Sequence, residues 1–207
     1  LSIPVQGSFV GAVGLGAFGT STLAIAGPSA LPPIPLRIWV AQRAGEGGAS
    51  DVVTPTFIAD QLSEANRLFA PFELSFEDGV DHGLIVNLTD LETRADRNAL
   101  AGQLAKGSCN VFFVGRLRDV DDPQLHRMGV MWRNLANLKQ KYVIVSSQAR
   151  ETTLAHELGH YLGNGHSSVK NNLMSYERDG GEVFLDEKQG AKARKTASAL
   201  FTSKELQ

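Results

Sequence analysis

The pattern of apolar and polar positions predicts short strands that alternate with helices from residue 36 onward. Apolar runs typical of strands lie at 36–41, 72–76, 83–88, 111–114, 128–132 and 142–145. Helical spacing of apolar residues predicts helices at 55–70, 96–104, 151–162 and 185–201, the first with Pro55 in its first turn. The stretches 45–50 and 119–123 are predicted to be a loop and a turn.

This order of elements indicates a mixed α/β or α+β fold. Strands separated by helices favour parallel pairing, and 111–114 is apolar enough to be a central strand. The close spacing of 128–132 and 142–145 is typical of a hairpin and predicts an antiparallel edge. We therefore expect a mixed, mostly parallel, twisted sheet.

The first 36 residues differ from the rest of the chain. They contain no Asp, Glu, Lys, Arg, His or Cys, and they are rich in Gly, Ala and Pro. This composition indicates an extended or flexible leader at 1–35, followed by one domain at 36–207. The chain does not begin with Met, so we expect a processed or a trimmed form.

Composition narrows the class of protein. With 207 residues, 43% hydrophobic and 20% charged, the chain is long enough for one well-packed domain that needs no disulfide bonds for stability. The net charge of −2 gives no electrostatic case for nucleic acid or for an anionic membrane, and no uninterrupted apolar run predicts a transmembrane helix. The single cysteine, Cys109, is expected to be a small buried core residue.

Three of the five histidines fall within eleven residues. His156 and His160 are four apart, so on a helix both imidazoles leave the same face and converge on one ion. Gly163 can end that helix in a left-handed conformation and return His166 to the same ion. Three imidazoles leave a position open for water, which is the pattern of catalytic zinc.

Glu157 follows the first ligand directly and is expected beside the metal without ligating it. There its carboxylate can act as general base and then as general acid. From composition alone, a chance match to these five positions is on the order of 10⁻⁵ over the chain.

The stretch from His156 to His166 resembles the metzincin zinc-peptidase signature His-Glu-x-x-His-x-x-Gly-x-x-His at every fixed position. The resemblance extends to a downstream Met-turn, here Asn172 to Tyr176. It implies that Met174 is the hydrophobic floor below the zinc and that Tyr176 assists the transition-state oxyanion. For Tyr176 the alternative is ordinary packing.

The resemblance also implies an architecture and a compartment. The upper subdomain would span about 36–163 with the active-site helix, and the small lower subdomain about 164–207 would end in a helix. The segment 128–132 would be an edge strand above the cleft that pairs with substrate, and the residue just after the cut would be selected by a pocket beside the zinc. The family implies a secreted or extracellular protein.

Several other polar residues could have functional roles, but simpler roles are favoured. Asp119, Asp121 and Asp122 offer carboxylates for Ca²⁺, as in some members of the family, but a solvated turn is favoured. For Glu177, Arg178 and Asp179 a solvated turn is favoured over the rim of a pocket. His82 and His126 are expected at the surface, and residues 1–36 hold no Cys or Asp that could cap the zinc.

The sequence therefore predicts a zinc-dependent endopeptidase that acts on protein or peptide substrates. Two alternatives stay open: a zinc-stabilised binding module without peptidase activity, and a toxin or effector protease with one narrow protein target. The oligomeric state, the natural substrate and the metzincin subfamily do not follow from the sequence.

Overall fold

A computed structural model describes residues 30–207 except 47, 80–81 and 86–87, so most of the predicted leader lies outside the described residues. The fold is built on a seven-stranded sheet whose main path runs β2-β1-β6-β9-β8, with β3 and β4 paired to β1. The sheet strands are β1 (Ile34–Gly45), β2 (Gly48–Asp51), β3 (Phe76–Asp78), β4 (Gly83–Ile85), β6 (Cys109–Val114), β8 (Gly129–Arg133) and β9 (Lys141–Ser146). The short strands β5 (Asp90–Leu91) and β7 (Arg116–Leu117) form a separate pair.

The predicted fold class is confirmed. β1 pairs in parallel with β3, β4 and β6, and β6 pairs in parallel with β9. β8 pairs antiparallel with β9 at one edge, and β2 pairs antiparallel with β1 at the other. The edge strand at 128–132 is therefore confirmed as β8, one residue later than predicted.

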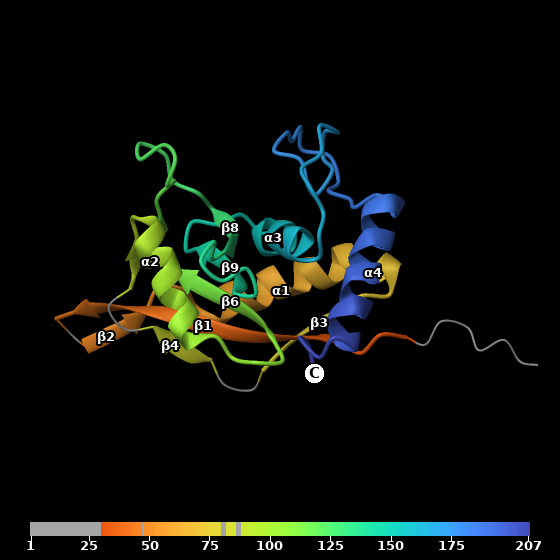
Figure 1. Ribbon diagram of the computed structural model, residues 1–207. Helices are drawn as coiled ribbons and strands as arrows, with labels where there is room; N and C mark the ends of the chain where they lie inside the picture. The colour runs from red at the N-terminus through yellow and green to blue at the C-terminus, as the bar shows by residue number, and fades with distance from the viewer. Residues whose placement is uncertain (1–29, 47, 80–81, 86–87) are drawn as a thin grey trace, which may run out of the picture.

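Side chains of the central strands alternate between two apolar clusters, one on each face of the sheet. In β6, Val111 and Phe113 belong to one cluster, and Phe112 and Val114 belong to the other. All six residues of β6 are buried, as expected for the central strand. The first cluster lies under α1, α3 and α4, so the faces of the sheet are unequal and the larger core supports the helix that carries the histidines (Figure 1).

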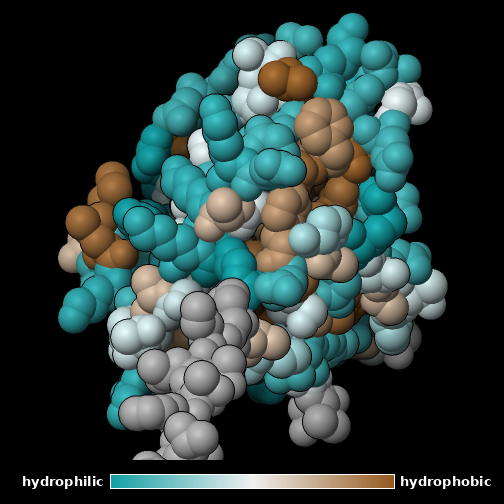
Figure 2. All heavy atoms as spheres, turned by 90° about the vertical axis from the view of Figure 1, so that its right-hand side faces the viewer, coloured by the Kyte–Doolittle hydropathy of each residue, from teal (hydrophilic) through white to brown (hydrophobic). Residues whose placement is uncertain are grey.

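The helices are α1 (Pro55–Phe69), α2 (Arg94–Ala99), α3 (Thr153–Tyr161) and α4 (Glu187–Thr202), with 3₁₀ turns at Ala70–Phe72 and Leu100–Gln103. The cap of α1 is Thr54, whose hydroxyl accepts the N–H of Phe57 at 3.1 Å. A capping box between Asp186 and Gln189 begins α4. The face of the molecule toward which α4 lies is largely hydrophilic, but apolar side chains gather near its middle and at one edge (Figure 2).

Two local predictions were wrong. The stretch 45–50 was expected to be a loop, but residues 48–51 form β2, whose partners are the last four residues of β1. The run 72–76 was expected to be a strand, but it begins in a 3₁₀ turn that ends at Phe72 and is followed by Glu73, which takes a left-handed φ of 54°. Only Phe76 of that run enters a strand, β3.

Two further expectations can be compared with the described residues. Cys109 is fully buried at the start of β6, as expected for a core residue. None of the described helices combines the length and the apolar character needed to span a membrane.

Candidate metal centre

Helix α3 carries the first two histidines and is fixed at its start by a side chain of α1. The buried amide of Gln61 accepts the N–H of Leu154 at 2.9 Å and donates to the carbonyl of Arg150 at 2.7 Å. This pairing satisfies backbone groups that would be left open at the start of α3. Since Gln61 lies on the buried face of α1, the position of α3 is set by the packing of the two helices.

Gly163 returns the chain toward the metal site, as predicted. Its φ is +92°, a left-handed conformation that glycine adopts without strain. The Asn164 N–H then donates to the Gly159 carbonyl at 2.9 Å, which closes the end of α3. The chain reversal brings His166 beside the two helical histidines.

The three imidazoles converge through their Nε2 atoms. His160 Nε2 lies 3.1 Å from His156 Nε2 and 3.0 Å from His166 Nε2. Nitrogens bound to tetrahedral zinc at about 2.0–2.1 Å would be about 3.3 Å apart, so the spacing is close to that of a zinc site. Among the residues that the structure describes, this is the one cluster of His, Cys, Asp or Glu arranged to hold a metal.

The outer nitrogens show that the donor set fits a cation. His156 Nδ1 lies 2.7 Å from the Leu173 carbonyl, and His160 Nδ1 lies 2.8 Å from the Asn164 carbonyl. A carbonyl only accepts, so each Nδ1 carries the proton and each neutral Nε2 presents a lone pair. Two lone pairs that face each other at 3.1 Å repel unless a cation lies between them.

The protonation of the histidines agrees with this arrangement. Burial lowers the pKa of His156 to about 4 and lowers the pKa of His160 in the same direction. Both imidazoles are therefore neutral near pH 7, which is the form that binds zinc. The site is prepared for a metal without first losing a proton.

Met174 lies against the helix that carries the first two histidines. Its side chain is fully buried, and a Cβ added at Gly159 would come within 2.5 Å of its Sδ atom. Gly159 lies between His156 and His160 on α3, so the thioether packs against the helix at the level of the two ligands. The turn itself is closed by the Asn172 side chain, which accepts the Met174 N–H at 2.9 Å.

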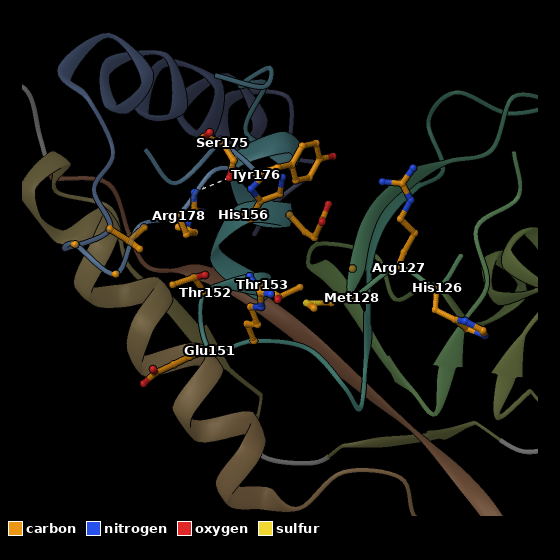
Figure 3. A pocket seen from close by; sticks show the side chains of 16 residues that line it. His126, Arg127, Met128, Glu151, Thr152, Thr153, His156, Ser175, Tyr176 and Arg178 are labelled. Atoms are coloured by element: carbon orange, nitrogen blue, oxygen red, sulfur yellow. Dashed lines mark hydrogen bonds between the residues drawn. The ribbon is translucent and has the colours of Figure 1, made fainter. Parts of the chain in front are cut away.

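Tyr176 also reaches the centre. Its hydroxyl lies 2.7 Å from His166 Nε2, and the phenol is 67% exposed. The ring lies close to His156 (Figure 3). Because the hydroxyl points at the metal position from the open side, the phenol can reach both the ion and a substrate oxygen.

Glu157 lies on the other side of the site, against strand β8. Its Oε2 accepts the backbone N–H of Met131 at 2.6 Å. Burial raises the pKa of Glu157 to about 7, and the hydrogen bond from Met131 opposes that shift. A carboxyl group with a pKa near neutrality can take and return a proton at physiological pH.

The close contact between β8 and α3 depends on Gly129. A Cβ at this position would meet the Thr153 methyl at 2.7 Å and Glu157 Cγ at 2.9 Å. The strand therefore approaches the helix at a distance that only glycine permits. This contact places the edge of the sheet beside the Glu157 carboxylate.

Arg178 has a role that the sequence did not indicate, and the expectation of a solvated turn was wrong for this residue. It is partly buried, and it donates to carbonyls of the Met-turn region: Nη1 to Asn172, Ser175 and Glu177 at 2.9, 2.6 and 3.1 Å, and Nη2 to Leu173 at 3.2 Å. The Leu173 carbonyl also receives His156 Nδ1. Arg178 thus supports the turn that orients the first ligand.

The three aspartates considered for calcium serve the turn. Asp119 Oδ1 accepts the N–H groups of Asp121 and Asp122 at 2.9 and 3.3 Å, and Oδ2 pairs with Arg127 at 2.6 Å. His82 and His126 are exposed, as expected.

Two pockets flank the metal centre. The His156-side pocket has a volume of about 470 Å³ and extends from Met128 and Gly129 to the start of α3 and to residues 178–183. The His160-side pocket has a volume of about 360 Å³ and lies along Val130 to Trp132. Glu157 and Tyr176 line both pockets, so the metal centre lies where they meet.

No protein-family model and no curated protein sequence matches the chain. The crystal structure of metalloproteinase-II from Bacteroides fragilis is similar, with a TM-score of 0.47 and 16% sequence identity over 79% of this chain and 53% of that one. The chain thus spans about half the length of that structure. The histidine triad stands on its own geometry, and in its motif and in the arrangement of that triad the chain resembles the metzincin zinc metallopeptidases.

Proposed function

We propose that the protein is a zinc-dependent endopeptidase. The observation that carries this proposal is the combination of three converging imidazole lone pairs with a buried, non-ligating carboxyl group at Glu157. A site that only stabilises the fold has no use for that carboxyl group. When bound, zinc supplies Lewis-acid activation of water and of a peptide carbonyl.

The side chains then have separate tasks in hydrolysis. The Glu157 carboxylate takes a proton from water as the water oxygen bonds to the peptide carbon. It gives that proton to the nitrogen as the C–N bond breaks, which forms an amine and a carboxylic acid; the acid's proton passes to the amine, so an ammonium and a carboxylate leave the site. The Tyr176 hydroxyl donates to the oxygen that becomes negative at the carbonyl carbon.

The free edge of β8 orients the substrate. The bonds from Ser146 N to Met128 O and from Asn134 N to Gln140 O show that even-numbered residues pair with β9. The backbone groups of Gly129 and Arg133 and the Met131 carbonyl therefore face away from β9, while the Met131 N–H is already bonded to Glu157. A substrate strand can add there by backbone hydrogen bonding, antiparallel to β8.

The mutation Glu157→Gln tests the mechanism. The amide keeps an acceptor for the Met131 N–H but cannot move a proton, so kcat/KM should fall by about 10²–10⁴-fold. Cleavage of a quenched-fluorescent peptide library gives the rate, and zinc content after dialysis shows that the metal is retained. The matched control is Glu187→Gln, which neutralises an exposed glutamate on α4.

The outcomes separate the hypotheses. Chelator-sensitive cleavage by the parent protein and loss in Glu157→Gln support the peptidase. Equal cleavage by both proteins would show that Glu157 is not the proton carrier. If the zinc-loaded parent cleaves neither the peptide library nor any protein in a proteome-wide search for new termini, it is a binding module.

A further inference from the structure

The His156-side pocket has an excess of positive charge near its walls. Arg150 and Arg178 both line it. Burial lowers the pKa of the Arg178 guanidinium, and the positive charge of Arg150 lowers it further. Two guanidinium groups therefore influence each other across this pocket. Among the described ion pairs, neither has a carboxylate partner.

The hydrogen bonds of Arg178 do not neutralise it. Its four contacts are with backbone carbonyls, which satisfy donors but carry no net charge. Figure 3 shows Arg178 near Tyr176 and His156, with one of these bonds drawn to Ser175. A guanidinium held only by carbonyls keeps its attraction for an anion.

The acidic groups near the pocket do not cancel this charge. In Figure 3 the Glu151 side chain points away from Arg178, and it is exposed. Glu157 is buried at the metal end and is bonded to Met131. Arg127, a third arginine in the lining, is the one that is paired, with Asp119.

The start of α3 adds to the positive electrostatic potential in this pocket. Thr152 and Thr153 line the pocket, so the N-terminal end of this nine-residue helix faces it. The first turn of α3 holds no acidic residue, and the Thr152 side chain makes no capping hydrogen bond. The Thr153 and Leu154 N–H groups are already bonded, to the Arg150 carbonyl and to Gln61, so the helix contributes the positive field of its dipole rather than free donors.

The direction of the substrate identifies which of its residues meets this pocket. A strand antiparallel to β8 runs from Arg133 toward Gly129, and hence from the His160-side pocket to the His156-side pocket. The metal centre lies between them. The residue that follows the cleaved bond therefore points into the His156-side pocket.

We propose that Arg150, Arg178 and the start of α3 select an acidic side chain, Asp or Glu, at the substrate residue just after the cleaved bond. This inference rests on the proposed peptidase function for its direction. The binding preference of the pocket can nevertheless be measured without cleavage.

The test uses three peptides that are identical except for Glu, Gln or Lys at that residue. Gln matches Glu in shape, so their difference reports charge. Because a charge-assisted contact replaces a neutral one, kcat/KM for the Glu peptide should exceed that for the Gln peptide about tenfold, with Lys the poorest. The preference should weaken as salt is raised.

Arg150→Glu is the informative variant, because the Arg150 side chain is exposed and does not clamp the Met-turn. The variant should reduce the Glu-over-Gln ratio to about one or below and improve cleavage of the Lys peptide. Lys195→Gln, which removes a positive charge from the exposed side of α4, should leave the ratio unchanged.

Fluorescence anisotropy with the zinc-loaded Glu157→Gln protein gives the binding preference without turnover. Tighter binding of the Glu peptide, abolished by Arg150→Glu, supports the pocket assignment even if the parent protein cleaves nothing. Equal rates and equal binding for the Glu and Gln peptides would overturn it while the peptidase proposal stands. Retention of the preference in Arg150→Glu would remove Arg150 from the assignment and overturn the two-arginine pocket.

Discussion

The two halves of the metal site are held by different forces. His156 and His160 lie on α3, which packs on a sheet whose central strands are fully buried. His166 lies in the lower segment, defined as residues 162–186, all of which are described and none of which is in a helix or strand. That segment adds Leu173, Met174 and Leu185 to the core, and hydrogen bonds hold the rest of it without a helix or strand. The helical ligands therefore depend mostly on apolar burial, and the third ligand depends on polar contacts as well.

The lower segment has its own small polar core. Asn172 is fully buried, donates to Gln189 Oε1 at 2.7 Å and accepts from Gln189 Nε2 at 3.1 Å. Asn164, also buried, donates to the Gln189 carbonyl at 3.2 Å. One residue of α4 thus anchors both ends of the loop that carries His166. A few amide hydrogen bonds stabilise this segment, whereas the packing of many apolar side chains stabilises the sheet.

The largest expected effect is on stability, from the sheet side. Phe113→Ala removes a fully buried ring from β6 and should lower the free energy of unfolding by about 3–5 kcal/mol. Urea titration measures the loss. Zinc affinity of the molecules that stay folded should change little, because Phe113 lies in the central strand and makes no hydrogen bond to a ligand. A large loss of zinc affinity at unchanged stability would contradict the division between the two regions.

An intermediate effect is expected from the polar core. Asn172→Ala leaves Gln189 Nε2 and the Met174 N–H without partners and should cost about 1–3 kcal/mol of stability. Because Asn172 shapes the turn that carries the Leu173 carbonyl, zinc affinity should also fall about 10–100-fold. Competition with a fluorescent chelator measures the affinity. If Asn172→Ala and Phe113→Ala change stability and zinc affinity in the same proportion, the comparison fails.

The smallest effect is expected at the junction of the two regions. Gly163→Ala forces a side chain into a left-handed conformation and should cost about 1–2 kcal/mol. Its added Cβ would lie 3.2 Å from Thr196 Oγ1, which is a tight but adjustable contact. Gly165→Ala is the matched control, since a Cβ there meets nothing within 4 Å and no left-handed φ is involved. Thermal unfolding of both variants gives the difference, and equal melting temperatures would show that the reversal carries no strain.

The same division explains which features could be predicted from the sequence. The four-residue spacing of His156 and His160, and the glycine that ends their helix, are local signals, and the structure places all three as expected. β2 was missed because its four exposed residues carry no apolar pattern and its register is supplied by β1. Arg178 was missed because its acceptors are carbonyls, whose positions depend on the folded loop. Sequence patterns therefore predict apolar burial well, but they predict hydrogen bonds between side chains and backbone carbonyls poorly.

Gly129 has a consequence for protein engineering. Any larger residue there would collide with α3. Substitutions at this position of β8 therefore cannot be used to reshape the pocket. Gly180, by contrast, faces open space at a φ of +90°, on the wall opposite β8. New specificities are therefore most accessible through substitutions and insertions beside Gly180, where the loop can change length while the strand, the helix and the histidines keep their places.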